Sequence, residues 1–268
     1  MKNKKKLLFL ITEDWFFCSH FLERALAAKK SGFEIIVCSR KNKDKKNIED
    51  FGFRFQEISF NRKSINPFYE FLILIKIINI YKRLSPDIVH HIAFKPIIYG
   101  SIAARINNIK SVVNAPVGMG FIFTSDSIKA LLIKPLIKFL LKNLLSFDGS
   151  KNKKNKVIFE NNDDLDYFVK IGAVRNNDTC LIRGAGVNIY KDFVVHKKKN
   201  KVPIIALVGR MLKDKGIYEY VDAAKILKEN NIKAEFLLIG GVDHFYSSSI
   251  DLKVLENWND QEIVNWLG

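Results

Sequence analysis

The chain has 268 residues, enough for one large domain or two ordinary ones, and 48% of them are hydrophobic. Its formal net charge is +16 at pH 7, from 44 Lys and Arg against 28 Asp and Glu. Such a charge predicts an anionic partner: a nucleotide sugar, an anionic lipid or a nucleic acid. The three cysteines are scattered without CxxC or metal-ligand spacing, which argues against a disulfide framework and predicts reduced packing residues in a cytoplasmic protein.

No stretch of the sequence has the length of a membrane span. The apolar run 7–11 that follows the basic start is soon followed by Glu13 and Asp14, and it is too short for a signal peptide. The run 71–80 is broken by Lys76 and Asn79. We therefore expect neither a signal peptide nor a transmembrane helix.

Residues 1–200 alternate between short apolar runs and segments with helical spacing, which is the pattern of a parallel sheet with crossover helices. The expected strands cover residues 7–11, 35–38, 51–55, 88–92, 111–115, 157–160 and 179–182. The expected helices cover 17–28, 66–78, 96–108, 126–145 and 164–171, with Asn66 and Asn161 at two helix starts and a charged surface loop over 40–50. The lysine-rich run 197–201 reads as a linker. The predicted class is α/β, with a complete Rossmann-like parallel-sheet domain over 1–200 and an incomplete second Rossmann-like domain over 201–268.

The most informative stretch is 203–243. Residues 204–208 have the pattern of a strand buried on both faces, and a basic loop, 210–215, follows Gly209. Gly216 opens an amphipathic helix, and a second strand, 236–239, ends at a pair of glycines. Strand, helix and strand form a parallel unit, which binds ligands at the carboxyl ends of its strands.

Arg210 and Lys215 fall at that edge, beside a helix N-terminus, where two cations and backbone N–H groups suit a diphosphate. Neither GxxxxGK[ST] nor GxGxxG is present. Taken alone, the pattern fits solvated loop lysines about as well as it fits a phosphate site.

Val208-Gly209-Arg210, Lys215-Gly216 and the Gly-Gly after the next strand resemble the donor site of family 4 retaining glycosyltransferases. The resemblance implies the two-domain GT-B architecture and a retaining, metal-independent transfer that needs no cofactor. Gly209, Arg210, Lys215 and Gly216 would bind the diphosphate of a nucleotide sugar, with UDP the expected nucleotide, and Arg210 and Lys215 would stabilise the leaving group. The acceptor would be a glycan or a polyprenyl-linked sugar. The family's Glu-x7-Glu motif is absent, so the sequence predicts a truncated second domain and weak activity, or none, for this chain alone.

His90 and His91 end the fourth expected strand and point to opposite faces. Relatives place a histidine near the sugar in this region, and His91, closer to the expected cleft, is the candidate catalytic residue. Lys95 is a second candidate anion contact. A histidine at a strand end is more often a core or capping residue, and residue 92 is Ile where some relatives have His-x-His.

Further acceptor-side candidates follow two other strands. Gly118 and Gly120 lie in a loop whose backbone can approach a substrate closely, although an ordinary turn fits equally well. After the first strand, Glu13 lies where many relatives have a glycine-rich loop, and its carboxylate could meet an acceptor hydroxyl.

The expected helix 126–145 carries Lys134, Lys138 and Lys142 among leucines. The commoner explanation is that these lysines form a solvent-exposed face of the helix. The more specific one is a peripheral contact with the anionic inner face of the cell membrane. Nucleic acid is not expected as a partner, since no nucleic-acid-binding signature appears. The alternatives to a glycosyltransferase are a non-catalytic basic binding module and, lower in rank, a sugar-nucleotide epimerase of the same architecture.

Overall fold

The computed structural model describes residues 4–61, 64, 66–118, 128–145, 154–187, 189, 200–243 and 248–268. The chain forms two compact units, Met1–Asn188 and Ile189–Gly268. The predicted boundary at 200/201 stays a prediction.

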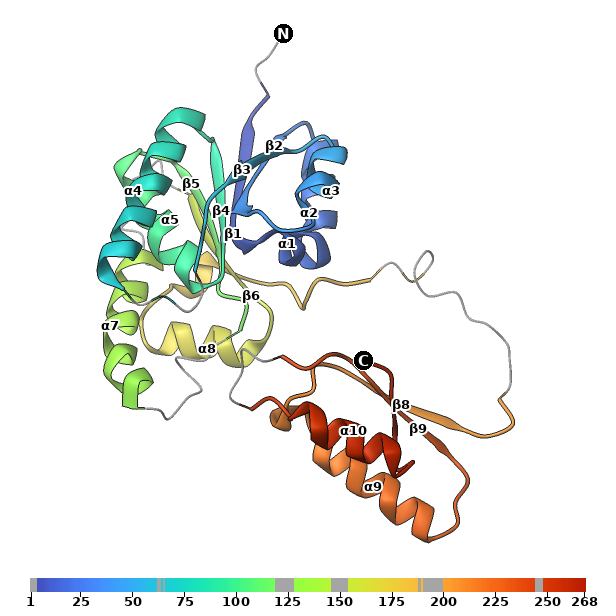
Figure 1. Ribbon diagram of the computed structural model, residues 1–268. Helices are drawn as coiled ribbons and strands as arrows, with labels where there is room; N and C mark the ends of the chain where they lie inside the picture. Colours follow the sequence, from blue (N-terminus) through green and yellow to red (C-terminus); the bar gives the residue numbers. More distant parts are fainter. Residues whose placement is uncertain are drawn as a thin grey trace. The chain divides into compact units, whose positions relative to one another are not determined.

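The first unit is built on a parallel sheet of seven strands within the described residues, in the order β3-β2-β1-β4-β5-β6-β7 (Figure 1). The strands are β1 (Lys6–Glu13), β2 (Glu34–Arg40), β3 (Arg54–Glu57), β4 (Ile88–Ile92), β5 (Ser111–Ala115), β6 (Lys154–Phe159) and β7 (Thr179–Leu181). The order of the strands reverses between β1 and β4, which places the topological switch point at the carboxyl ends of these two strands. The predicted Rossmann-like sheet is confirmed.

Helices cover both faces of this sheet. They are α1 (Asp14–His20), α2 (Leu22–Lys30), α3 (Lys45–Asp50), α4 (Pro67–Leu84), α5 (Phe94–Ile106), α7 (Ile128–Leu145) and α8 (Asn162–Lys170), with a 3-10 turn, η1 (Asn176–Asp178). One core lies between the sheet and α4 and α5, a second between the sheet and α1, α2 and α3, and a third under α5, α7 and α8. Both predicted caps form, because the side chains of Asn66 and Asn161 accept backbone N–H bonds from the first turns of α4 and α8.

Three local predictions for this unit were wrong. The charged segment 40–50 is not all loop, since α3 buries one apolar residue, Ile48, in the core while its charged residues face outward. The helix predicted over 17–28 is two helices that meet at Phe21. The third strand begins only at Arg54, because residues 51–53 complete the turn after α3, where the Phe53 N–H donates to the Ile48 carbonyl at 3.4 Å.

The second unit contains a parallel three-stranded sheet in the order β10-β9-β8, within the described residues. Its elements are β8 (Ile204–Val208), the 3-10 turn η2 (Lys213–Lys215), α9 (Ile217–Glu229), β9 (Glu235–Ile239), α10 (Leu252–Asp260) and β10 (Asn265–Trp266). In Figure 1, α9 and α10 lie together against the sheet, and both contribute to the single core of this unit. The predicted strand–helix–strand unit is confirmed.

The burial predicted for β8 was wrong. Ile204 and Ile205 are exposed, and Val208 has 75% of its surface accessible. β8 is at an edge of the sheet, and its Leu207 contributes to the core formed with α9 and α10. Hydrophobic composition identified the strand, but it could not show how much of the strand is covered.

Candidate functional site

The loop between β8 and α9 is fixed by the strand beside it. The Gly209 N–H donates to the Ile239 carbonyl at 2.9 Å, and the Met211 N–H donates to the Gly241 carbonyl at 3.2 Å. These bonds continue the pairing of β8 with β9 past the end of both strands. The first residues of the loop therefore have a defined position at the carboxyl edge of the sheet.

Gly240 makes this close approach possible. It has φ +144°, and a Cβ atom there would lie 1.9 Å from the Gly209 carbonyl oxygen. No residue with a side chain fits that space without a movement of the backbone. Among the described residues, a Cβ on Gly209 or Gly241 would meet nothing within 4 Å, so of these three glycines Gly240 is the one that packing requires.

Residues 248–250 hold the other side of the loop. The Lys213 N–H donates to the Ser248 carbonyl at 2.8 Å, and the Ile250 N–H donates to the Met211 carbonyl at 2.9 Å. Met211 and Leu212 are buried. The loop is thus anchored by its apolar residues, while its charged residues face outward.

The two predicted donor-site cations lie at the two ends of this anchored loop. Arg210 directly follows the Gly209 bend, and its Nη1 is 3.0 Å from Asp243 Oδ2. Lys215 ends η2, and Gly216, at φ +74°, turns the chain into the first turn of α9. The first N–H groups of a helix have no partners within the helix and attract anions. Two exposed cations and a helix N-terminus therefore occupy one edge of the second unit.

Asp243 was missed by the sequence analysis. It lies in the segment that follows β9, three residues beyond Gly240, and it reaches the guanidinium of Arg210 across the edge of the sheet. A signal was present in the sequence, because an acidic residue just after Gly-Gly must lie near the end of β8 when the two strands are neighbours and parallel. The loop also contains Asp214, whose pKa is held below its usual range chiefly by a hydrogen bond from the Ser248 side chain.

His91 lies inside the first unit and not at its surface. Its side chain is fully buried, Nδ1 is 2.8 Å from Asn114 Oδ1, and Nε2 is 3.0 Å from the Tyr81 hydroxyl. A Cβ on Gly100 would lie 2.5 Å from the imidazole ring, so the helix α5 packs directly on it. Burial lowers the pKa of His91 to about 4, although the bond to Asn114 opposes this shift. This environment matches a core histidine, and it gives no support to the predicted position nearer the site edge.

His90 lies on the other face of β4 and is also buried. Its ring packs against Phe9 and Phe21, with centroid distances of 5.2 and 5.8 Å. Its Nε2 has no hydrogen-bond partner within the described residues. Burial, followed by the charges of His91 and Arg24, lowers the pKa of His90 to about 3. Both histidines are therefore neutral at physiological pH.

Lys95, the predicted second anion contact, is held by groups of its own unit. Its Nζ donates to the carbonyls of Asn61 and Ser64 at 2.8 and 2.6 Å and lies 2.6 Å from Glu70 Oε1. The other carboxylate oxygen of Glu70 accepts from the Tyr99 hydroxyl, also at 2.6 Å. These contacts tie the segment before α4 to α5, and they do not support an anion-binding role for Lys95.

Glu13 is the last residue of β1, at the switch point, whereas the sequence predicted it in the loop after that strand. It is nearly buried, and its Oε2 accepts from Asn42 Nδ2 at 2.8 Å. Asn42 also binds Asp14 through its side chain and its backbone N–H. Gly118 has φ +80°, and among the described residues a Cβ there would meet nothing within 4 Å. Gly120 lies outside the described residues.

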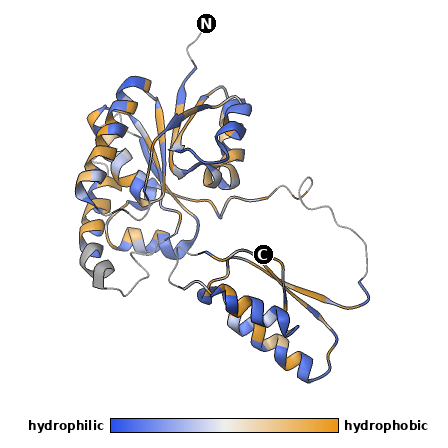
Figure 2. Cartoon of the chain, in the orientation of Figure 1, coloured by the Kyte–Doolittle hydropathy of each residue, from blue (hydrophilic) through white to orange (hydrophobic). Residues whose placement is uncertain are grey.

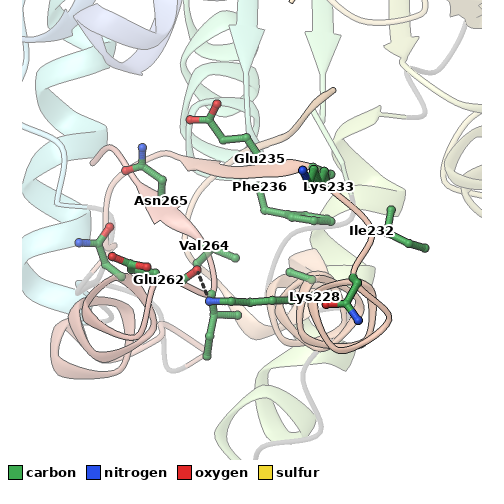
Figure 3. A pocket seen from close by; sticks show the side chains of 13 residues that line it. Lys228, Ile232, Lys233, Glu235, Phe236, Glu262, Val264 and Asn265 are labelled. Carbon is green, nitrogen blue, oxygen red and sulfur yellow. Dashed lines mark hydrogen bonds between the residues drawn. The ribbon is translucent and has the colours of Figure 1, made fainter. Parts of the chain in front are cut away.

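A hollow of about 720 Å³ lies elsewhere in the second unit (Figure 3). It is lined by residues at the amino ends of β9 and β10 and the end of α9, and Lys228 donates across it to the Glu262 carbonyl at 3.3 Å. This is the edge of the sheet opposite to Arg210, so the hollow is not the donor site. Within the described residues, no three His, Cys, Asp or Glu side chains lie close enough to bind a metal ion.

Comparison with known proteins defines the class. Residues 6–147, more than half of the chain, match the family described as Glycosyl transferase 4-like, and the chain belongs to that family. The family was predicted from residues around Arg210 and Lys215, in the second unit. The match that confirms this family lies in the first unit.

Two curated relatives agree with this assignment. The chain is 28% identical over 232 residues to N,N'-diacetylbacillosaminyl-diphospho-undecaprenol alpha-1,3-N-acetylgalactosaminyltransferase of Campylobacter jejuni, with 82% of this chain and 58% of the relative covered. It is 22% identical over 221 residues to the capsular polysaccharide biosynthesis glycosyltransferase CapM of Staphylococcus aureus, with 80% of this chain and 56% of the relative covered. The chain thus spans a little over half the length of either relative.

The fold also has solved counterparts. A structure of Anabaena Alr3699/HepE in complex with UDP and glucose superimposes with a TM-score of 0.65 at 14% identity, covering 98% of this chain and 69% of that one. At this identity the likeness shows the fold alone, and it confirms the predicted GT-B class. None of the helices in the described part of the chain has the length and apolar character that a membrane span requires.

Proposed function

We propose that this chain carries the donor-binding part of a retaining glycosyltransferase, which transfers a sugar from a nucleotide sugar to a glycan or polyprenyl-linked acceptor. The observation that supports this best is the anchored loop between β8 and α9. It presents Arg210 and Lys215 at the carboxyl edge of a parallel sheet, next to a helix N-terminus.

In the proposed reaction, the bond between the sugar and the diphosphate breaks and negative charge develops on the departing phosphate oxygen. Arg210 and Lys215 stabilise that charge more strongly than they stabilise the intact donor, which lowers the barrier. Gly209 and Gly216 let the backbone approach the phosphates. The acceptor hydroxyl oxygen forms the new bond to the anomeric carbon of the sugar, and its proton passes to the departing phosphate oxygen. Glu13 and Gly118 remain proposed acceptor-side residues, whereas for His91 we favour a structural role within the core.

The nature of the donor and acceptor is proposed from the relatives. One relative is named for an N-acetylgalactosaminyl transfer to a diphospho-undecaprenol-linked sugar, and one structural neighbour holds UDP and glucose. By analogy with these proteins, we propose that the donor of this chain is UDP-linked and that its acceptor is a glycan or a lipid-linked sugar. The chain would act at the cytoplasmic side of the membrane.

The expected affinity is modest. Each charge-assisted contact contributes about 1.5 to 3 kcal/mol, and two of them together correspond to dissociation constants of roughly millimolar to tens of micromolar before ordering costs. Weak binding of UDP by the chain alone is therefore consistent with the proposal.

Calorimetric titration with UDP tests the donor site. Arg210→Ala and Lys215→Ala should each weaken binding by about tenfold or more. Lys213→Ala is the matched control, because it removes one positive charge from the same exposed loop. Equal heats for all four proteins would favour a non-catalytic basic module. If turnover is observed, the anomeric configuration of the product tests retention, and conversion of the nucleotide sugar without transfer would favour an epimerase.

A further inference from the structure

The outer side of α4 carries an apolar ridge that the sequence analysis did not assign. Phe68, Phe71, Leu72 and Ile75 have exposed fractions of 72%, 58%, 48% and 40%. At 3.6 residues per turn, their spacing of three, one and three residues confines all four to an arc of about 100°. Isolated exposed hydrophobic residues are common on protein surfaces, but four large ones in one stripe are not.

The opposite side of α4 already has its partners. Ile73, Ile77, Ile80 and Tyr81 are buried against the sheet. The helix is therefore fully seated in the core, and the ridge is a second apolar surface, which the described residues do not cover. Figure 2 shows that much of both α4 and α7 is hydrophobic.

The charges along the ridge are all positive. Toward the end of α4 the stripe continues through exposed Asn79 and Lys82, with exposed Lys76 and Arg83 along one side of it. The one acidic residue of α4, Glu70, is mostly buried and bound by Lys95 and Tyr99. The exposed side of α4 is thus apolar in its first half and basic in its second half.

The helix α7 repeats this composition. Both α4 and α7 pack against α5 in the first unit. Residues 128–145 include four lysines and no Asp or Glu, and Leu136 and Phe139 are exposed. From the sequence, a membrane contact was predicted only for the lysines of α7, whereas the exposed side chains make α4 the better candidate for that contact.

We propose that the ridge of Phe68, Phe71, Leu72 and Ile75, with the basic residues that continue it, docks the first unit onto the surface of an anionic lipid bilayer. Aromatic and aliphatic side chains would enter the boundary between headgroups and acyl chains, and the lysines would remain at the anionic headgroups. The charged groups of the ridge and its extension are all positive, which complements an anionic bilayer surface. The ridge would be the surface that brings the protein to a lipid-linked acceptor, and in this respect the inference rests on the proposed function.

Co-sedimentation of the full chain with lipid vesicles tests the docking surface. The chain should bind vesicles of phosphatidylcholine with phosphatidylglycerol more strongly than vesicles of phosphatidylcholine alone, and added salt should weaken the binding. The double variant Phe68→Ser/Phe71→Ser should lower the partition coefficient roughly tenfold or more, because two large apolar groups no longer enter the lipid. Lys76→Glu/Lys82→Glu should remove the preference for phosphatidylglycerol.

The matched control is Ile226→Ser, which removes an equally exposed apolar side chain from α9 of the second unit. It should bind vesicles like the unchanged protein. The proposal is overturned if the unchanged protein does not bind anionic vesicles, or if the phenylalanine variant binds them as the control does. Self-association through the ridge without vesicle binding would also overturn it and would identify a second copy as the occupant. The assay contains no nucleotide, so its outcome is separate from that of the UDP titration.

Discussion

Arg210 Nη1 lies 3.0 Å from Asp243 Oδ2, so the arginine proposed to bind the donor diphosphate is already paired with a carboxylate from the neighbouring strand's loop. The pair is partly exposed, and it should contribute less than about 1 kcal/mol to stability. Its importance is for binding, because the carboxylate holds the guanidinium in place and also competes with a phosphate for it.

Asp243→Asn should tighten UDP binding by about three- to tenfold. The amide oxygen can still accept from the guanidinium, but the negative charge beside the incoming diphosphate is lost. The effect should shrink at high salt. Calorimetric titration at two ionic strengths measures both changes.

The opposite result for this variant is also informative. Weaker binding by Asp243→Asn would mean that the full charge is needed to orient Arg210. The melting temperature should stay close to that of the unchanged protein in either case.

Gly240→Ala should disrupt the donor loop. The added methyl group would lie 1.9 Å from the Gly209 carbonyl oxygen, so the ends of β8 and β9 must move apart. We expect a destabilisation of about 3 kcal/mol or more in the second unit, together with loss of UDP binding. Gly241→Ala, whose methyl group would meet nothing within 4 Å, is the control and should keep both properties. Chemical denaturation followed by circular dichroism distinguishes the two variants, and equal stability would contradict the close approach.

Tyr81→Phe should destabilise the first unit without affecting nucleotide binding. It removes the hydroxyl 3.0 Å from His91 Nε2 and leaves a buried polar nitrogen without that partner, at a cost of about 1 to 3 kcal/mol. Urea denaturation measures the loss. If UDP affinity fell while stability stayed constant, the structural role that we favour for His91 would have to be abandoned.

The buried histidines should make the protein sensitive to acid. Burial lowers the pKa of His90 to about 3 and that of His91 to about 4, whereas both titrate near the ordinary value of about 6.5 when unfolded. Between these values the unfolded chain binds more protons than the folded chain. The stability that each neutral buried histidine contributes is therefore fully present above about pH 6.5. It is lost as the pH falls, and the free energy of unfolding decreases by roughly 3 kcal/mol per histidine over two pH units.

His90→Phe tests this pH dependence. Phenylalanine can pack between Phe9 and Phe21, and it does not bury a ring nitrogen that lacks a partner. The slope of unfolding free energy against pH between 4 and 6 should fall by about one proton relative to the unchanged protein. His20→Asn, at an exposed histidine, controls for the loss of one imidazole. If the slope is unchanged in His90→Phe, the lowered pKa of His90 is not a source of the acid sensitivity.

The elements and their order were largely readable from the sequence. The strands β4 and β5 and the start of α4 were predicted at their observed bounds, because each has a dense local signal: a short β-branched run, or Asn-Pro ahead of an apolar helix. The errors fell where one residue decides the structure. Ile48 alone gives α3 its buried side, and Phe21 separates two helices that share one apolar periodicity.

The sequence by itself determined that this chain forms parallel α/β units and that two cations follow the first strand of the second one, since strand, glycine and helix signals are local. Only the tertiary structure decided which of the singled-out side chains remain at the surface. It places His91 and Lys95 among partners in the first unit, pairs Arg210 with Asp243, and leaves the ridge of α4 exposed. These outcomes depend on which segments distant in the sequence come to lie beside each residue, and periodicity within one segment contains no information about that.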